Sequence, residues 1–263
     1  MNFRGRWVLV TGASSGLGQA MAKLLAQRYG ANILAVARRL SKLEALKTEL
    51  AASGVELVPI AADLAQPADV ARVLDEAKRV PLYAVILNAA VTHFGRHEEL
   101  AARDFEAMVQ TNVLSTVRLT SELLPYLEAR DEGGGVLLVS SMAGLTPIPY
   151  QAAYSATKAF LTSFGQSLWH ELRGKNVSLT IYAPGGIATE MTAGERFGKL
   201  RSWLMPVDTA ARLGLAAFAR REYLHVPGII NRVGSWLMKI LPSKLVTAQM
   251  ARTYRASLEA ARP

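Results

Sequence analysis

The stretch Trp7-Val8-Leu9-Val10-Thr11-Gly12-Ala13-Ser14-Ser15-Gly16-Leu17-Gly18 decides the fold of this chain. Residues 7–10 form a short apolar run typical of a buried parallel strand, and a helical pattern follows over 19–29. Glycines at such a turn let the backbone approach a phosphate, and the helix N-terminus offers free N–H groups and a positive dipole end. The stretch therefore predicts a dinucleotide-binding unit at the start of the domain.

Further apolar runs alternate with helical patterns along the chain. They occur at Ile33–Val36, Leu57–Ile60, Leu82–Leu87 and Val136–Val139. Such alternation predicts a doubly wound, mostly parallel sheet. The chain has 263 residues, is 51% hydrophobic and contains no Pro/Gly/Ser-rich linker. We therefore predict an α/β fold, with a single Rossmann-type domain over 1–263 and a helical C-terminal extension.

The end of the second apolar run indicates which dinucleotide binds. An acidic residue there would hydrogen-bond the ribose 2′-hydroxyl of NAD, but Ala37 holds that place and Arg38 and Arg39 follow. Because a guanidinium matches the geometry of a phosphate, the turn favours NADP(H). A basic turn that is merely solvated is the alternative.

A second stretch, from Ser140 to Lys158, contains groups suited to acid–base chemistry. Tyr154 and Lys158 are four residues apart, so on a helix they would share one face. An ammonium close to a phenol lowers the pKa of the tyrosine and makes it a usable general acid or base. Ser140 and Ser141 follow the apolar run at 136–139, at the edge where parallel sheets bind ligands. An ordinary surface Tyr–Lys pair is the alternative.

Several classes of site and location are not expected. The chain has no cysteine, which excludes disulfides, thiolate catalysis and cysteine metal sites. His93 and His97 have no third ligand at a matching offset, so no metal is predicted. The first residues lead straight into a strand, which leaves no room for a signal peptide, and no apolar run is long enough to span a membrane. We expect a cytoplasmic protein.

The joint spacing of these motifs resembles the classical short-chain dehydrogenases/reductases over about residues 5–192. The matching positions are Thr11-Gly12-x-x-x-Gly16-x-Gly18, Asp63, Asn88-Ala89-Ala90, Asn112, Ser141, Tyr154-x-x-x-Lys158 and Pro184-Gly185-x-x-x-Thr189. The resemblance implies a homodimer or homotetramer that interconverts a carbonyl and an alcohol.

The resemblance also implies roles for single residues. Tyr154 would exchange a proton with the substrate oxygen, Ser141 would hydrogen-bond that oxygen, and Lys158 would hold the nicotinamide ribose. Asn112 would position a water for proton relay, completing the catalytic set. The implied cofactor-binding residues are Gly12, Ser14, Ser15, Gly16, Leu17, Gly18, Arg38, Arg39, Asp63, Leu64, Asn88, Ala89, Tyr154, Lys158, Pro184, Gly185, Ile187 and Thr189.

Two segments depart from the family pattern. Asn-Asn-Ala-Gly of the family appears as Asn88-Ala89-Ala90-Val91, and the lost glycine removes freedom for positive φ in the loop. Thr157 replaces the serine usually found before the lysine.

The positive charge is concentrated in the last quarter of the chain. Of the net charge of +9, residues 1–194 contribute 18 − 17 = +1 and residues 195–263 contribute 12 − 4 = +8, so the pattern does not indicate nucleic acid. Residues 193–263 would form a substrate lid, with Glu195–Met205 as its mobile part, followed by basic amphipathic helices. The helix predicted over Gly228–Leu241 is apolar, with Trp236 and flanking Arg/Lys, as in helices at membrane surfaces. Packing against its own domain or another subunit is the alternative.

We therefore expect an NADP(H)-dependent oxidoreductase that reduces a carbonyl to a secondary alcohol, or the reverse, on an apolar, lipid-like or acyl substrate. Two other classes stay open at this stage: a catalytically idle NADP(H)-binding regulator, and a protein whose main role is to bind a membrane or an acyl carrier protein through its basic tail.

Overall fold

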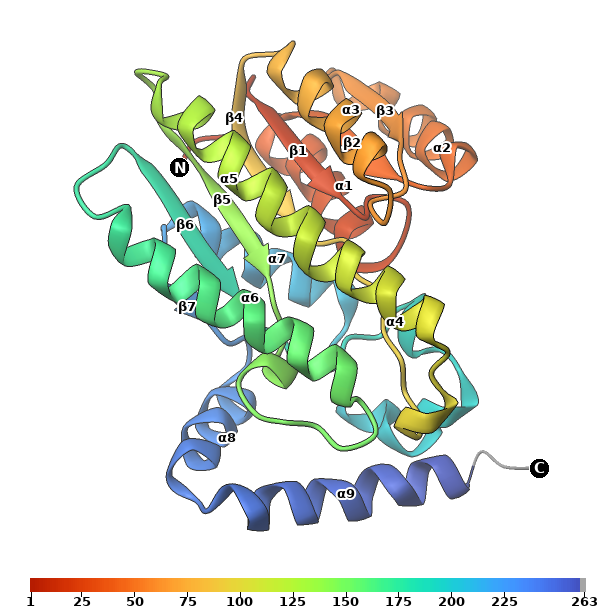
Figure 1. The fold of residues 1–263 in the computed structure, drawn as a ribbon. Helices are drawn as coiled ribbons and strands as arrows, with labels where there is room; N and C mark the ends of the chain where they lie inside the picture. The colour runs from red at the N-terminus through yellow and green to blue at the C-terminus, as the bar shows by residue number, and fades with distance from the viewer. Residues whose placement is uncertain (261–263) are drawn as a thin grey trace.

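The predicted parallel sheet is present in the computed structural model, which describes residues 1–260. Over these residues the sheet has seven strands in the order β3-β2-β1-β4-β5-β6-β7, and each neighbouring pair is parallel (Figure 1). Their bounds are β1 Trp7–Thr11, β2 Asn32–Ala37, β3 Leu57–Ala61, β4 Leu82–Leu87, β5 Gly134–Val139, β6 Val177–Tyr182 and β7 Leu224–His225. The strand order reverses between β1 and β4, and this switch point is where doubly wound sheets bind their ligands.

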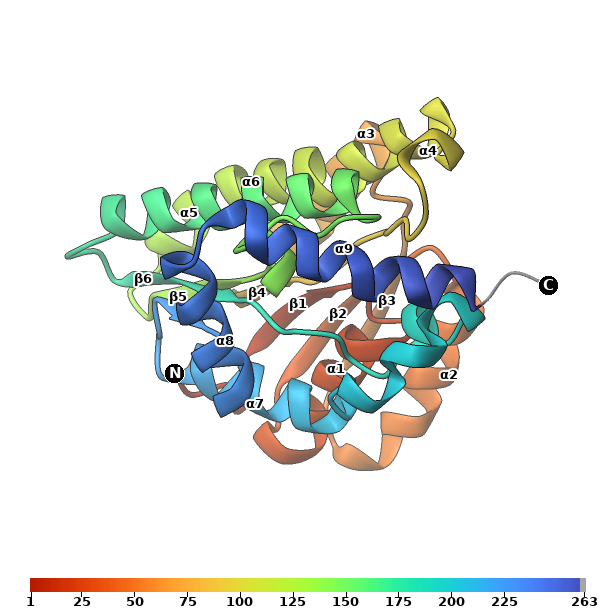
Figure 2. The same ribbon diagram turned by 90° about the horizontal axis from the view of Figure 1, so that it is seen from below.

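Helices cover both faces of the sheet, which explains why β1, β4 and β5 are mostly apolar and are buried along their whole length (Figure 2). On one face, α1 (Gly16–Tyr29), α2 (Leu40–Leu50) and α7 (Val207–Ala219) bury side chains such as Met21, Leu43 and Phe218. On the other face lie α3 (Pro67–Lys78), α5 (Ser115–Glu128) and α6 (Ala152–Glu171), with a separate apolar core. The apolar residues on the inner side of α3, Val70, Val73, Leu74 and Ala77, are buried.

A long helical segment over residues 102–128 contains a π-helical turn in its middle. It consists of α4 (Ala102–Val109), the π-helical turn (Gln110–Leu114) and α5. Asn112 lies inside the π-helical turn, a local widening of the helix that is often found at functional sites.

Short 3₁₀ helices and two further α-helices complete the described chain. The 3₁₀ segments are Ala51–Ser53, His97–Glu99, Met142–Gly144, Glu190–Thr192 and Glu195–Trp203. The two α-helices, α8 (Ile229–Ile240) and α9 (Ser243–Glu259), cross beside the carboxyl ends of the strands (Figures 1 and 2). The helix predicted over Gly228–Leu241 is present as α8, and each of its ends differs by one residue. Among residues 1–260, no helix has the length and apolar character needed to cross a bilayer.

Candidate active site

The glycine-rich turn after β1 brings the start of α1 against the ends of β1 and β4. A Cβ on Gly18 would lie 2.4 Å from the Gly12 carbonyl oxygen and 2.5 Å from Asn88 Nδ2. Gly12 has a φ of +71°, which side chains disfavour, and a Cβ there would lie 2.7 Å from Asn88 Nδ2. Only glycine fits at these two positions. The N-terminus of α1 therefore reaches the carboxyl edge of the sheet, where its free N–H groups suit a phosphate.

Asn88 ties the ends of β1 and β4 together across the switch point. Thr11 Oγ1 accepts hydrogen bonds from the backbone N–H groups of Asn88 (2.9 Å) and Ala89 (3.0 Å). Asn88 Nδ2 in turn donates to the Thr11 carbonyl oxygen at 3.0 Å. These three bonds hold the two strand ends at a fixed separation beside the glycine-rich turn.

The remaining candidate cofactor residues lie at the same edge of the sheet. Asp63 and the buried Leu64 follow β3, and Asp63 Oδ1 accepts from the backbone N–H of Ala65 at 3.1 Å. After β6, the Thr189 methyl group faces the glycine-rich turn, because a Cβ on Gly16 would lie 3.2 Å from it.

The segment from Pro184 to Ile187 joins this edge to the catalytic loop and to the lid. The Pro184 carbonyl oxygen accepts from Met142 N at 2.9 Å, and Ile187 forms an isolated parallel bridge with Met205. A Cβ on Gly185 would lie 3.4 Å from the Met142 sulfur. These contacts bring the glycine-rich turn, the ends of β1 and β4 and the segment after β6 together at the carboxyl edge of the sheet.

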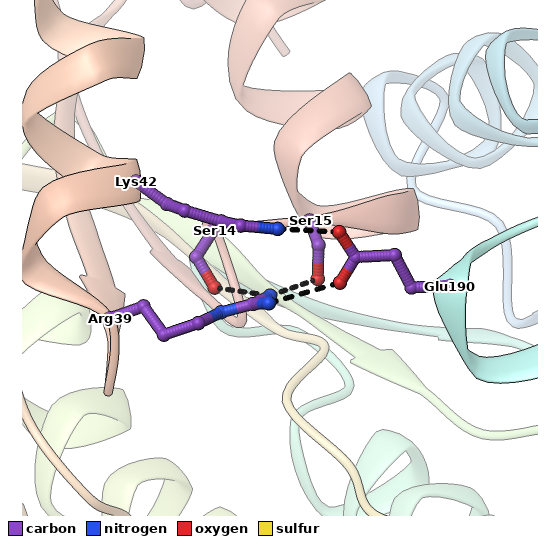
Figure 3. A network of polar contacts seen from close by, with 5 residues as sticks. All are labelled: Ser14, Ser15, Arg39, Lys42 and Glu190. Carbon is purple, nitrogen blue, oxygen red and sulfur yellow. Dashed lines mark hydrogen bonds and ion pairs between the residues drawn. The ribbon is translucent and has the colours of Figure 1, made fainter.

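A network of charged side chains lies at the end of β2 (Figure 3). Arg39 donates from Nη2 to Ser15 Oγ at 2.9 Å and to Ser14 Oγ at 3.3 Å. Its Nη1 lies 3.1 Å from the Glu190 carboxylate, which also pairs with Lys42 Nζ at 2.5 Å. Hydrogen bonds from Lys42 and Arg39 hold the pKa of Glu190 below its usual value. Arg39 and Lys42 therefore bind an oxyanion, which in this structure is the carboxylate of Glu190.

The three predicted catalytic groups after β5 meet at its carboxyl end. Ser141 is the N-cap of a 3₁₀ turn, and its Oγ accepts from Ala143 N at 3.1 Å. Tyr154 and Lys158 lie on the first turns of α6, with Lys158 Nζ 5.7 Å from the centre of the tyrosine ring. The neighbouring Ser140 is buried, and its hydroxyl bonds to the Lys158 carbonyl oxygen and to Thr162. Ser141 is therefore the serine that faces the site.

The pKa of Tyr154 differs from the prediction. Burial raises the pKa of Tyr154 to about 12, against a weaker opposite effect of its hydrogen bond with Ser141. The Lys158 ammonium donates to the Val139 carbonyl oxygen at 2.9 Å, and its Nζ lies 5.7 Å from the centre of the tyrosine ring. Burial also lowers the pKa of Lys158 to about 8. Helical spacing alone wrongly suggested that the charge of the lysine would control the phenol, whereas in this structure desolvation dominates.

Asn112 connects the loop after β4 to α6. Its Oδ1 accepts from Val91 N at 2.9 Å, and its Nδ2 donates to Val91 O at 2.9 Å and to Thr157 Oγ1 at 3.1 Å. Thr157 Oγ1 donates in turn to the Tyr154 carbonyl oxygen at 2.7 Å. Within residues 1–260, positive φ at non-glycine residues occurs only at Tyr150 and Arg221. Valine at position 91 is therefore accommodated without strain, and both departures from the family pattern contact Asn112.

Sequence patterns had not indicated the contributions of Glu190, Lys42 and Tyr150. Glu190 directly follows Thr189, and only this adjacency could have drawn attention to it. Tyr150 has a φ of 64°, and its carbonyl oxygen accepts from Gly95 N at 3.0 Å, which links the catalytic loop to the loop after β4. Over the described residues, no group of three or more His, Cys, Asp or Glu side chains is arranged to hold a metal ion.

Aromatic side chains join the lid segment, the loop after β4 and α9. The Phe94 ring lies 4.7 Å from the Phe197 ring and 5.4 Å from the Tyr254 ring, measured between centroids. Arg196 Nη1 donates to the Phe94 carbonyl oxygen at 2.7 Å. The lid segment, the loop after β4 and α9 therefore pack together as one apolar wall.

Comparison with known proteins agrees with this geometry. The family model for short chain dehydrogenases matches residues 6–199. An uncharacterized oxidoreductase of Myxococcus xanthus is 39% identical over 252 residues, which cover 94% of this chain and 97% of that protein. The 3-oxoacyl-[acyl-carrier-protein] reductase of Escherichia coli is 29% identical over 245 residues, or 87% of this chain and 98% of that protein.

Solved structures show the same fold. A short-chain dehydrogenase from Sphingobium yanoikuyae in complex with NADPH has a TM-score of 0.79 and 28% identity, and the match covers 90% of this chain and 96% of that one. The family model spans more than half of the sequence, and the strand order and the catalytic loop agree with it. The chain therefore belongs to the short-chain dehydrogenase family and is an oxidoreductase of that family.

Proposed function

We propose that this protein uses NADP(H) to reduce a carbonyl to a secondary alcohol, or to run the reverse reaction, on an apolar substrate. The observation that carries the proposal is the convergence of Ser141, Tyr154 and Lys158 at the carboxyl end of β5. This group faces the crevice beside the glycine-rich turn, as a hydride-transfer site requires.

The residues around the crevice fit NADP(H). Gly12 and Gly18 let the start of α1 pack against the ends of β1 and β4, where its free N–H groups suit the pyrophosphate. No acidic residue ends β2, whereas Arg38 is exposed and Arg39 and Lys42 already hold a carboxylate. A cluster that binds an oxyanion also suits a 2′-phosphate. The NADPH complex of the similar Sphingobium structure supports this choice.

When bound, the nicotinamide would supply or accept the hydride, and the side chains would handle the proton. The Ser141 hydroxyl would hydrogen-bond the substrate oxygen, and Tyr154 Oη would donate its proton to it. Because the pKa of Tyr154 is raised to about 12, the phenol is protonated at neutral pH. Lys158 would hold the nicotinamide ribose. Asn112, in the π-helical turn, would position a water for proton relay.

The apolar wall supports a hydrophobic substrate. Phe94, Phe197 and Tyr254 lie between the lid and the loop after β4 and would exclude water from the reacting carbonyl. The match to an acyl-carrier-protein reductase of Escherichia coli is consistent with an acyl or lipid-like substrate. For the assembly we propose a homodimer or homotetramer, and for the location the cytoplasm.

Turnover with a panel of apolar ketones and NADPH tests this function, with Tyr154→Phe measured in parallel. The proposed enzyme consumes NADPH with at least one ketone, and the variant loses this activity but keeps the cofactor. A catalytically idle regulator would instead bind NADPH with equal affinity in both forms and show no Tyr154-dependent turnover with any ketone. That result would reject the enzymatic assignment.

A further inference from the structure

One side of α8 and the start of α9 expose a row of large apolar side chains, called here the docking face. Their exposed fractions lie between 44% and 88%, which is unusual for so many neighbouring aliphatic residues. The docking face consists of Ile229, Ile230, Val233, Trp236, Leu237, Ile240, Leu241 and Leu245. The sequence left open that α8 packs against its own domain. In the structure, these side chains are not covered by such packing.

The contacts of α9 with the lid and the catalytic loop lie in its second half. Ser257 Oγ donates to the Arg196 carbonyl oxygen at 2.6 Å, and Tyr254 packs on Phe94. Arg255 Nε also donates to the Tyr150 hydroxyl at 2.9 Å. These contacts fasten α9 to the lid and to the catalytic loop. The C-terminal half of α9 is thus attached to the domain, whereas the docking face on α8 and the start of α9 stays exposed.

The charge around the docking face has one sign. From Tyr223 to Leu258 the sequence contains no Asp or Glu, but α8 and the start of α9 contain Arg232, Lys239 and Lys244. A cavity of about 550 Å³ beside Trp236 is lined by Arg220 and Arg232. The one carboxylate in that lining, Glu222, pairs with Arg220, so the positive charge that the lining presents comes from Arg232. An anionic partner would therefore meet positive charge both around the apolar side chains and in the adjoining cavity.

We propose that the docking face binds the surface of an anionic lipid bilayer, with α8 lying in the plane of the interface. An amphipathic helix with aliphatic residues and tryptophan on one side and flanking cations suits this environment. A second copy of the chain is a poorer match, because a two-fold contact through this face would bring its cations together. Each Arg or Lys near an anionic surface strengthens binding by about fivefold.

The docking face adjoins the catalytic edge of the sheet. A Cβ on Gly185 would lie 3.1 Å from Asn231 Nδ2, so the first turn of α8 touches the segment that follows β6. A bilayer bound to α8 would therefore lie next to the substrate side of the site. An apolar substrate could then enter from the lipid without crossing water. The docking itself does not depend on the proposed reaction.

Co-sedimentation of the full chain with vesicles tests the proposal. The vesicles are phosphatidylcholine alone, or phosphatidylcholine mixed with phosphatidylserine, each at low and at physiological salt. We expect binding to the mixed vesicles only, weakened by salt because screening shortens the reach of exposed charges. Trp236→Glu should reduce the bound fraction at least about tenfold, since it places a charge in the apolar side of the interface. The matched control is Phe160→Glu, which changes an exposed phenylalanine on α6 and should bind like wild type.

Thermal unfolding and NADPH affinity are measured for each variant to check that its core is intact. A protein that sediments equally with both vesicle types, or with neither, would overturn the proposal. A Trp236→Glu protein that binds like wild type would do the same. If light scattering shows a dimer that Trp236→Glu converts to monomers while vesicles stay unbound, the docking face is a contact between copies.

Discussion

Asn112 should be needed for the rigidity of the site, and Asn112→Ala tests this. The amide is fully buried and makes three hydrogen bonds, two with the backbone of Val91 and one with Thr157. Alanine removes all three and provides no replacement. The loop after β4 would then lose its attachment to α6 beside Tyr154 and Lys158.

The size of the effect follows from these contacts. At about 1 kcal/mol for each hydrogen bond lost, the variant should be destabilised by about 3 kcal/mol. For a chain of this length that lowers Tm by roughly 6 to 12 °C. Turnover should fall by about tenfold or more, because small displacements of catalytic groups are costly.

Thermal unfolding followed by circular dichroism measures the Tm, with Thr157→Ser as the matched control. Serine keeps the hydroxyl that contacts Asn112, so its Tm should stay within about 2 °C of wild type. The reasoning fails if Asn112→Ala unfolds within the same margin. It also fails if the variant is destabilised as expected but keeps wild-type turnover, because the amide would then support only the fold.

Four further predictions concern the cofactor and the proton. Tyr154→Phe should lower turnover by about 100-fold or more with little change in NADPH affinity, and retention of a tenth of the rate would contradict acid catalysis. Arg38→Asp should shift the cofactor preference from NADPH towards NADH, and Arg39→Asp is measured beside it for comparison. A wild type that already prefers NADH would refute the assignment of NADP(H). Glu190→Gln should tighten NADPH severalfold and leave NADH unchanged in titrations, whereas weaker binding of both would show that Glu190 supports the cofactor. Burial lowers the pKa of Lys158 to about 8 from 10.5, so the unfolded chain binds more protons between these values and stability rises with pH there. The Tm of wild type relative to Lys158→Met should therefore increase from about pH 8 to pH 10, and a flat difference would count against the buried charge.

The fold was predictable because its signals are local. The run Trp7–Gly18 contains a strand, a turn and a helix start within twelve residues, and each later strand is a short apolar run. Strand–helix alternation then leaves few topologies open. The helices α8 and α9 were also found from periodicity, since a helical pattern needs no information from the rest of the chain.

The features that escaped prediction depend on contacts between distant parts of the chain. The π-helical turn contains Asn112, whose amide contacts Val91 and Thr157, 21 and 45 residues away. The pKa of Tyr154 depends on burial, which a four-residue spacing to Lys158 does not describe. A local pattern identified these residues as candidates, but only the fold shows which neighbours each one has.

The Arg39 network illustrates why such contacts bear on function. Arg39 is held by Ser14, Ser15 and Glu190, and its partnership with Glu190 spans 151 residues. A guanidinium already fixed in place gives up less freedom when it binds a phosphate, which favours affinity. The Glu190 carboxylate has the opposite effect, because a phosphate must displace it from Arg39 and Lys42. Since Glu190 begins the segment that leads into the lid, entry of a 2′-phosphate would release that segment from α2. Cofactor choice and lid position would then be coupled through Glu190. A cofactor without the 2′-phosphate would leave Glu190 bound to Arg39 and Lys42.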